Sequence, residues 1–260
     1  RYARKQLKEK LMIETLTVII IIVAFLLAGS IKGIIGLGLP TVSLGLLTAT
    51  LDLTTAMVLL LIPSFITNIW QATVGGNGKF IIKRIWPFLC LATVTIWLGS
   101  AVLTITNPLY LSILLGALLF VYSTLNLLGF RLSISPKHEK WSGPLLGAVN
   151  GILTGMTGSF VVPGVMYLQA IGLPRDKLVQ AMGMLFSLST IGLAFALQNN
   201  NLLTSELATI SAFAVVPSII GMVVGQKIRK SLSETRFRRI FFVSILVLGA
   251  FIIAKSALAL

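Results

Sequence analysis

The stretch GSIKGIIGLGLPT, residues 29–41, places one lysine and four glycines inside an otherwise apolar run. A lysine near the middle of a membrane costs about 2.5 to 3.5 kcal/mol on insertion scales, so Lys32 is a candidate functional group. The alternative is that its long stem carries the ammonium to an interface. The dense glycines followed by Pro40 indicate that one helix unwinds here and a second begins at the proline. We therefore expect a broken helix with a cation beside the break.

The composition of the chain places this break in a membrane. Of 260 residues, 56% are hydrophobic and only 11% are charged, a balance outside the range of water-soluble domains. Several uncharged runs exceed the roughly 20 residues that a spanning helix needs, and they lack the alternation of barrel strands. Helices are then the way to satisfy the backbone in lipid, so the predicted fold class is an all-α integral membrane protein with about eight hydrophobic helical segments. The expected helices cover 15–36, 53–74, 85–104, 109–129, 142–156, 178–198, 204–226 and 238–258, with half-helices at 38–51 and 158–171.

The formal charge of +14 comes from cations that lie between the hydrophobic runs. They do not form a soluble basic face, so we expect no nucleic-acid partner. Their distribution follows the positive-inside rule, which indicates a multi-pass protein of the cell (cytoplasmic) membrane in contact with the lipid bilayer. The loops expected in the cytoplasm are 75–84, 131–140 and 227–239, and those expected outside are 104–108 and 198–205.

Two parts of the chain resemble each other. GSIKGIIGLGLPTVSLGLL from Gly29 matches GAVNGILTGMTGSFVVPGVMYL from Gly147, and TAMVLLLIPS (55–64) matches QAMGMLFSLS (180–189). Such self-similarity is common in transporters, whose substrate site lies at the repeat interface. The predicted organisation is a basic N-terminal flank (1–14), a first transmembrane repeat (15–130), a basic cytoplasmic linker (131–141) and a second transmembrane repeat (142–260).

Counting the membrane crossings favours an inverted repeat. The positive-inside rule puts residue 52 outside and residues 175–177 inside. Residue 52 of the first half, however, corresponds in position to residues 175–177 of the second half. An inverted repeat resolves this conflict if each half opens with a broken or re-entrant helix. At least the second half would then open with a re-entrant hairpin. The side of the N-terminus stays open here, because the five cations of residues 1–14 favour the inside and strict inversion favours the outside.

The seven acidic residues all lie in flanks or at predicted loop edges, so none is placed to neutralise Lys32. A mobile anion is then its natural counter-charge, assisted by free N–H groups where a helix restarts at Pro40. Two alternatives stay open: the glycines serve only close helix packing, and the hydroxyls bond back to their own helix. The predicted substrate-binding residues are Lys32, Gly36, Gly38, Pro40, Thr41, Ser64, Asn68, Asn150, Thr154, Gly155, Thr157, Gly158, Ser159, Pro163, Gln180 and Ser189.

The sequence lacks the motifs that enzymatic catalysis, nucleotide binding or metal binding would need. It holds no HExxH motif, cysteine pair, histidine cluster or nucleotide-binding loop, so we expect no enzyme, no cofactor and no metal site. The single cysteine, Cys90, lies in an apolar run and is interpreted as a buried structural thiol.

Three stretches carry a family resemblance: GLGLPT (36–41), LDLTTAMVLLLIPSFITNIWQ (51–71) and GILTGMTGSFVVPGVMYLQAIGLPRDKLVQAMG (151–183). They resemble the sulfite exporter TauE/SafE family, also called the toluene sulfonate uptake permease family, over nearly the whole chain. The resemblance implies a bacterial transporter of two related halves that moves sulfur-containing or related small organic anions. The first half departs from the commoner run of three or four glycines, with GIIGLGLP behind Lys32.

The sequence therefore predicts a secondary-type transporter of small anions with alternating access at the repeat interface. The resemblance implies that the anion is sulfite, thiosulfate, an organosulfonate or a related organic anion. One rival is a channel-like anion conductor, and another is a non-transporting membrane scaffold for a partner enzyme. A homo-oligomer is possible. The anion, the direction of transport, the coupling ion and the oligomeric state are left open.

Overall fold

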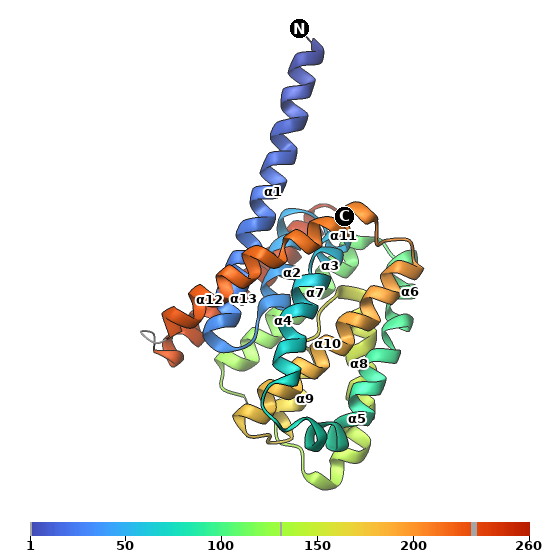
Figure 1. The fold of residues 1–260 in the computed structure, drawn as a ribbon. Helices are drawn as coiled ribbons and strands as arrows, with labels where there is room; N and C mark the ends of the chain where they lie inside the picture. The colour runs from blue at the N-terminus through green and yellow to red at the C-terminus, as the bar shows by residue number, and fades with distance from the viewer. Residues whose placement is uncertain (1, 131, 230–232) are drawn as a thin grey trace.

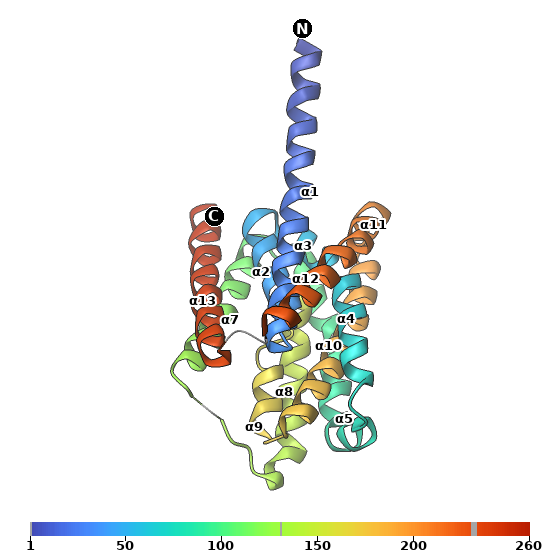
Figure 2. The ribbon, with the colours of Figure 1, turned by 60° about the vertical axis from the view of Figure 1, so that its left-hand side comes forward.

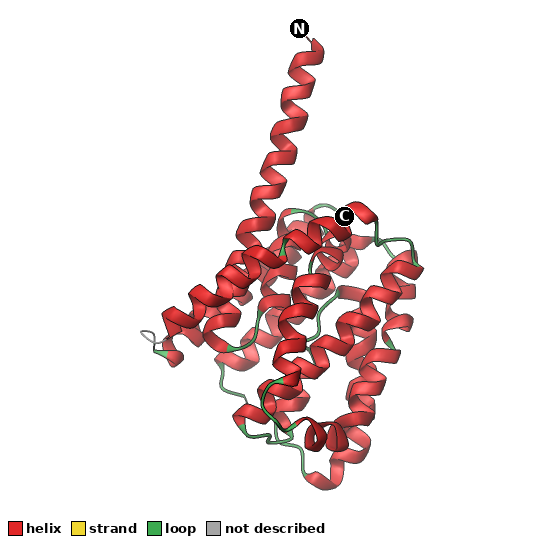
Figure 3. Cartoon of the chain, viewed as in Figure 1, coloured by secondary structure: helices red, strands yellow, loops and turns green. Residues whose placement is uncertain are grey.

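The computed structural model is a bundle of helices (Figures 1 and 3), and within the described residues it contains no strand. It describes residues 2–130, 132–229 and 233–260, without the side chains of residues 2–13 and 234, so the cations expected in those parts lie outside the description. The helices are α1 (Tyr2–Ile35), α2 (Leu39–Thr50), α3 (Leu53–Leu59), α4 (Leu61–Thr73), α5 (Gly78–Val94), α6 (Ile96–Ile105), α7 (Pro108–Leu127), α8 (Pro136–Thr157), α9 (Gly164–Ala170), α10 (Arg175–Asn199), α11 (Ser205–Phe213), α12 (Val215–Arg229) and α13 (Glu234–Leu258).

Among the described residues, six helical segments are long and apolar enough to span a membrane, or seven if α3 and α4 form one bent span. This confirms an all-α integral membrane protein. The helix α8 does not qualify, and its first turns hold Lys137, Glu139 and Lys140. The prediction that α8 and α9 form a re-entrant pair stays a prediction.

Several segments that the sequence predicts as one continuous helix are divided into two helices in the structure. The expected helix 53–74 divides at Leu60, where α3 and α4 meet at an angle of 45°. Ser211 of α11 enters this break, because its hydroxyl donates to the Leu59 carbonyl over 2.9 Å and accepts the Ile62 N–H over 3.2 Å. A side chain inserted in this way replaces helical hydrogen bonds and fixes the bend. Pro63, in the first turn of α4, has no N–H to lose there.

The two breaks that open the halves differ in length. The first is short: α1 ends at Ile35 and α2 begins at Leu39, with Pro40 in its first turn. The second is longer, and here the sequence prediction was wrong in part. The half-helix expected over 158–171 begins only at Gly164, because residues 158–163 are not helical. Gly158 ends α8 in the left-handed conformation, with φ at 74°, which a residue without Cβ adopts at little cost.

Close glycine contacts join the halves. A Cβ at Gly33 of α1 would lie 2.2 Å from the carbonyl oxygen of Met222 on α12, and one at Gly225 would lie 2.1 Å from that of Ser30. In the same way α8 packs on α5 and α6, where a Cβ at Gly147 would lie 2.5 Å from the Phe88 carbonyl oxygen. The opening helix of each half thus lies against a later span of the other half. Small residues permit this approach of helix backbones.

The opening helices run in opposite directions (Figure 2). In both ribbon views the start of α1 projects from one end of the bundle, whereas α8 begins at the other end, near the start of α5. The N-terminal end therefore lies opposite the loops that precede α5 and α8.

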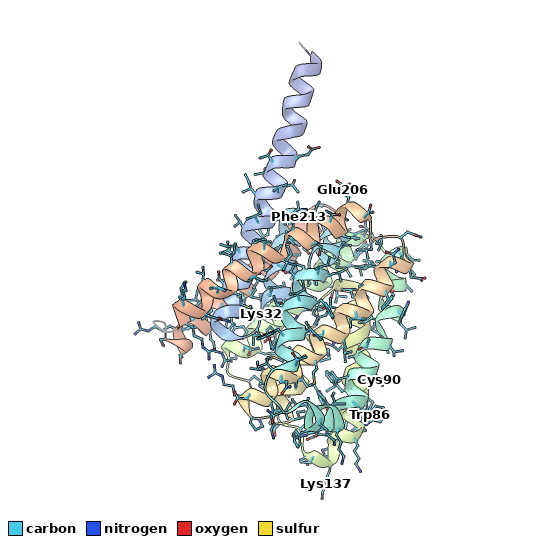
Figure 4. The ribbon with its side chains drawn as sticks, in the orientation of Figure 1. Lys32, Trp86, Cys90, Lys137, Glu206 and Phe213 are labelled. Atoms are coloured by element: carbon cyan, nitrogen blue, oxygen red, sulfur yellow. The ribbon has the colours of Figure 1, made fainter. Side chains whose placement is uncertain are left out.

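The outer surface of the bundle is apolar, and Cys90 belongs to it (Figure 4). Its thiol is exposed on α5, so the interpretation of Cys90 as a buried structural residue was wrong. The physical reason is that a lipid-facing surface is as apolar as a protein core. An apolar run therefore does not tell which of its residues face inward.

Candidate functional site

Lys32 lies in the interior of the bundle, between the ends marked by Lys137 and Glu206 in Figure 4. Its side chain is 5% exposed, and it belongs to the last turn of α1. The ammonium donates to the Thr67 hydroxyl over 3.2 Å and to the amide oxygen of Asn68. Both acceptors are neutral, and no carboxylate of the described residues forms a salt bridge with Lys32. Snorkelling to an interface does not describe this lysine, since its head group ends on α4 inside the protein.

The hydrogen bonds of Lys32 continue across the bundle. Asn68 donates from Nδ2 to the Ser64 hydroxyl over 2.9 Å, and the Ser64 and Thr190 hydroxyls lie 3.4 Å apart. Thr190 in turn donates to the Phe186 carbonyl over 2.6 Å. We call Lys32, Thr67, Asn68, Ser64 and Thr190 the lysine network. It joins α1, α4 and α10, and all its members are buried.

The first break holds two glycines with positive φ close to this network. Gly36 and Gly38 have φ values of 80° and 111°, which favour glycine. The N–H of Gly36 bonds to the Lys32 carbonyl over 2.8 Å, so the break begins within one turn of the lysine. No side chain caps α2, and Pro40 and Thr41 in its first turn are buried. This start of α2 matches the predicted arrangement of uncapped N–H groups.

The second break is tied to its own half. The amide oxygen of Asn150 on α8 accepts the N–H of Gly164, the first residue of α9, over 2.9 Å. Thr154 donates to the Ser159 carbonyl over 2.9 Å, and Thr157 donates to the carbonyl four residues before it over 2.7 Å. The peptide bond before Pro163 is cis. The Thr157 hydroxyl therefore bonds back to its own helix, which was the alternative left open, whereas the Thr154 hydroxyl bonds a carbonyl in the break beyond the end of α8.

Two predicted residues keep an unused polar atom. Asn150 Nδ2 and Ser189 Oγ are buried and have no hydrogen-bond partner within the described part of the chain. A Cβ at Gly164 would lie 2.5 Å from Asn150 Oδ1 and 3.0 Å from a methyl of Leu185, so Asn150 and Leu185 of α10 both lie close to Gly164. Ser189 lies one turn beyond Leu185 on that helix and next to Thr190 of the lysine network. Unpaired buried donors are costly, so a polar group that visits this region would be stabilised by them.

Other predicted site residues serve packing in this structure. Gln180 joins helix ends: its Nε2 donates to the Ala72 carbonyl over 2.9 Å, and its Oε1 accepts the Asn77 N–H over 3.1 Å. Gly155 lies against α6, where a Cβ would be 2.2 Å from the Ile96 carbonyl oxygen. Gly158 lies against α3, where a Cβ would be 2.7 Å from the side chain of Met57.

Sequence analysis missed two members of the lysine network, Thr67 and Thr190. A signal was present, because Thr67 lies three residues after Ser64 and so shares its helical face. Thr190 directly follows the predicted Ser189, but a hydroxyl beside another hydroxyl gave no reason to choose it.

Within the described residues, no group of three or more His, Cys, Asp or Glu side chains could hold a metal ion. Apolar spans opened by broken helices, with a polar network and a cation in their interior, define a multi-pass membrane protein with an internal polar site. The model of the family described as Sulfite exporter TauE/SafE matches residues 21–252. The chain belongs to this family, as the resemblance implied, and is thereby a membrane transporter of the sulfite and anion exporter type. The chain has no match among curated proteins or among solved structures.

Proposed function

We propose that this protein moves small anions by alternating access through a site at the lysine network. The anion is sulfite, thiosulfate, an organosulfonate or a related organic anion. The observation that carries the proposal is the buried Lys32 ammonium, whose hydrogen-bond partners among the described residues are the neutral oxygens of Thr67 and Asn68. A buried cation with neutral partners is best stabilised by an anion, and family membership supports the same substrate class.

In this proposal the anion takes the place of Asn68 and Thr67 as the partner of Lys32. The uncapped start of α2, near Thr41, then offers N–H groups to the oxygens of the anion. The unpaired Nδ2 of Asn150 and hydroxyl of Ser189 complete the set from the second half. The released amide of Asn68 stays bonded to Ser64, so the network has a second arrangement without losing every partner.

The motion proposed is that of one inverted repeat, residues 15–130, against the other, residues 142–260. The opposite directions of α1 and α8 in Figure 2 and the exchanged glycine packing of these helices support two inverted halves. In the proposed topology the loops before α5 and α8 face the cytoplasm, and the N-terminal end of α1 lies on the outer side of the cell membrane.

The test is uptake of labelled sulfite, thiosulfate and small sulfonates into proteoliposomes, under imposed voltage and pH gradients, for wild type and Lys32→Ala. The matched control is Lys255→Ala, since Lys255 of α13 bonds the Ala49 carbonyl over 2.8 Å and takes no part in the network. Saturable flux that is lost only in Lys32→Ala supports the proposal. Flux that is indifferent to Lys32 contradicts the site, and single-channel currents would establish the channel instead.

A further inference from the structure

A polar cavity of about 320 Å³ lies outside the lysine network, where the linker between the halves meets the end of α7, the helix α9 and the starts of α10 and α13. Its wall is formed by both halves of the chain. Residues of the lining include Asn126, Phe130, Leu132, Gln169, Leu178 and Arg238.

The linker side of this cavity is held in place by backbone hydrogen bonds. The N–H of Ile134 bonds to the carbonyl of Ala170 at the end of α9 over 2.9 Å, and the N–H of Phe130 bonds to the Leu125 carbonyl over 3.0 Å. Gly129 has φ at 70° and turns the chain away from α7. Ile134 of the linker is thus held beside the end of α9.

The polar side chains of the cavity have unused donors. Arg238 is exposed, and its guanidinium carbon lies 6.0 Å from the centre of the Phe242 ring. Asn126 is anchored, because it donates to the Tyr122 carbonyl over 2.8 Å. In the described part of the chain, neither the Arg238 guanidinium nor the Gln169 amide has a hydrogen-bond or ion-pair partner. An arginine with no carboxylate partner among the described residues, in the same cavity wall as an amide without a described partner, suits an acceptor with several oxygens.

Two larger cavities differ from this one in chemistry. They measure about 610 and 480 Å³ and are lined almost wholly by apolar side chains, such as Phe241 and Leu248 in one and Ile191 and Phe195 in the other. Such grooves suit lipid chains and offer nothing to an anion. The cavity at Arg238 is therefore chemically distinct from the lipid-facing grooves.

We propose that the cavity at Arg238 is a second anion site, which binds a tetrahedral oxoanion of the sulfate or phosphate type. Arg238 provides paired N–H donors and Gln169 provides its amide N–H. The oxoanion comes either free from the aqueous phase or as the phosphate of an anionic lipid headgroup, and both present the same oxygens. A bound oxoanion bridges α13 to α9 and so braces the second half. This inference does not depend on transport through the lysine network.

The experiment measures binding to the full chain, purified free of lipid in a neutral detergent at low ionic strength, by titration calorimetry. The probes are sodium sulfate and dioctanoyl phosphatidylglycerol. The variants are Arg238→Gln and Gln169→Leu, and the matched control is Arg239→Gln, which removes the same charge one residue away and outside the cavity lining. Size-exclusion chromatography establishes that each variant is folded, and Gln169→Leu tests the site even if Arg238→Gln does not fold.

We expect Arg238→Gln to weaken binding about tenfold or more, as for the loss of a charged hydrogen bond. Gln169→Leu should weaken it about threefold to tenfold, and Arg239→Gln less than twofold. Binding of both probes supports a free oxoanion as the source, and binding of the lipid alone supports the headgroup. The proposal is overturned if neither probe binds wild type, or if Arg238→Gln and Arg239→Gln lose affinity equally, which would indicate surface charge only.

Discussion

Lys32 and Asn150 occupy equivalent positions in the two halves but form different contacts. Aligning Gly29 and Gly33 with Gly147 and Gly151 brings the two residues into register. The ammonium of Lys32 reaches across to α4, whereas the amide oxygen of Asn150 bonds to α9, the next helix of its own half.

The equivalent residues therefore have different roles in the two halves. The first half leaves its second helix without a side-chain cap and places a charge near the break, and in the function proposed above this is where the anion binds. The second half uses the equivalent position to cap α9, and the Nδ2 of Asn150 has no hydrogen-bond partner among the described residues. One position thus provides charge in one half and local structure in the other. The predictions below separate these two roles.

The largest expected effect comes from Lys32→Met, which replaces lysine by an unbranched side chain one atom shorter and removes its charge. Anion flux should fall about tenfold to a hundredfold, the cost of a lost charged hydrogen bond. The unfolding temperature should stay the same or rise, because a buried charge with only neutral partners stabilises the fold little. Uptake assays and thermal unfolding in detergent measure the two quantities. A variant that transports normally would place the anion elsewhere.

Asn150→Leu tests the opposite role. It removes the acceptor of the Gly164 N–H, and a buried donor without a partner costs about 1 to 3 kcal/mol. The variant should therefore unfold at a lower temperature than Lys32→Met. If Lys32→Met unfolded at a lower temperature than Asn150→Leu, the conclusion that Asn150 stabilises the fold more than Lys32 does would be wrong.

The two breaks also differ in how closely their glycines are packed. Gly36 and Gly158 both have positive φ, so alanine at either position costs about 1 to 2 kcal/mol of backbone strain. A Cβ at Gly36 meets nothing within 4 Å, whereas at Gly158 it approaches Met57 to 2.7 Å. Gly158→Ala should thus lower the unfolding temperature more than Gly36→Ala. Equal losses would mean that Met57 moves aside freely.

The smallest expected effect is that of Ser64→Ala within the lysine network. The Asn68 amide loses one neutral hydrogen bond, worth about 0.5 to 1.5 kcal/mol, so flux should fall about twofold to tenfold. Ser123→Ala is the control, since the Ser123 hydroxyl is buried on α7 without a partner in the described chain. Uptake at low anion concentration measures both. Equal flux in the two variants would exclude Ser64 from the site.

The predicted substrate-binding residues overlap with the lysine network. Lys32, Asn68 and Ser64 could be predicted because polar residues are rare in this chain and lie near the glycine breaks. The partner Thr190 could not, since the contact between α4 and α10 depends on how two helices far apart in the sequence approach each other. The prediction that Cys90 is buried was wrong because inward-facing and lipid-facing positions of a span have similar composition, so the sequence alone does not distinguish them.

The sequence by itself determined the membrane class, the helical fold, the family and both breaks, because hydropathy, glycine and proline act through local physical chemistry. It did not determine what each break contains. Only the tertiary structure decided that Lys32 ends on Asn68, that Asn150 caps α9 and that Ser211 fixes the bend at Leu60. These contacts join segments that are distant along the chain. Their partners are selected by the packing of whole helices, which no local pattern records.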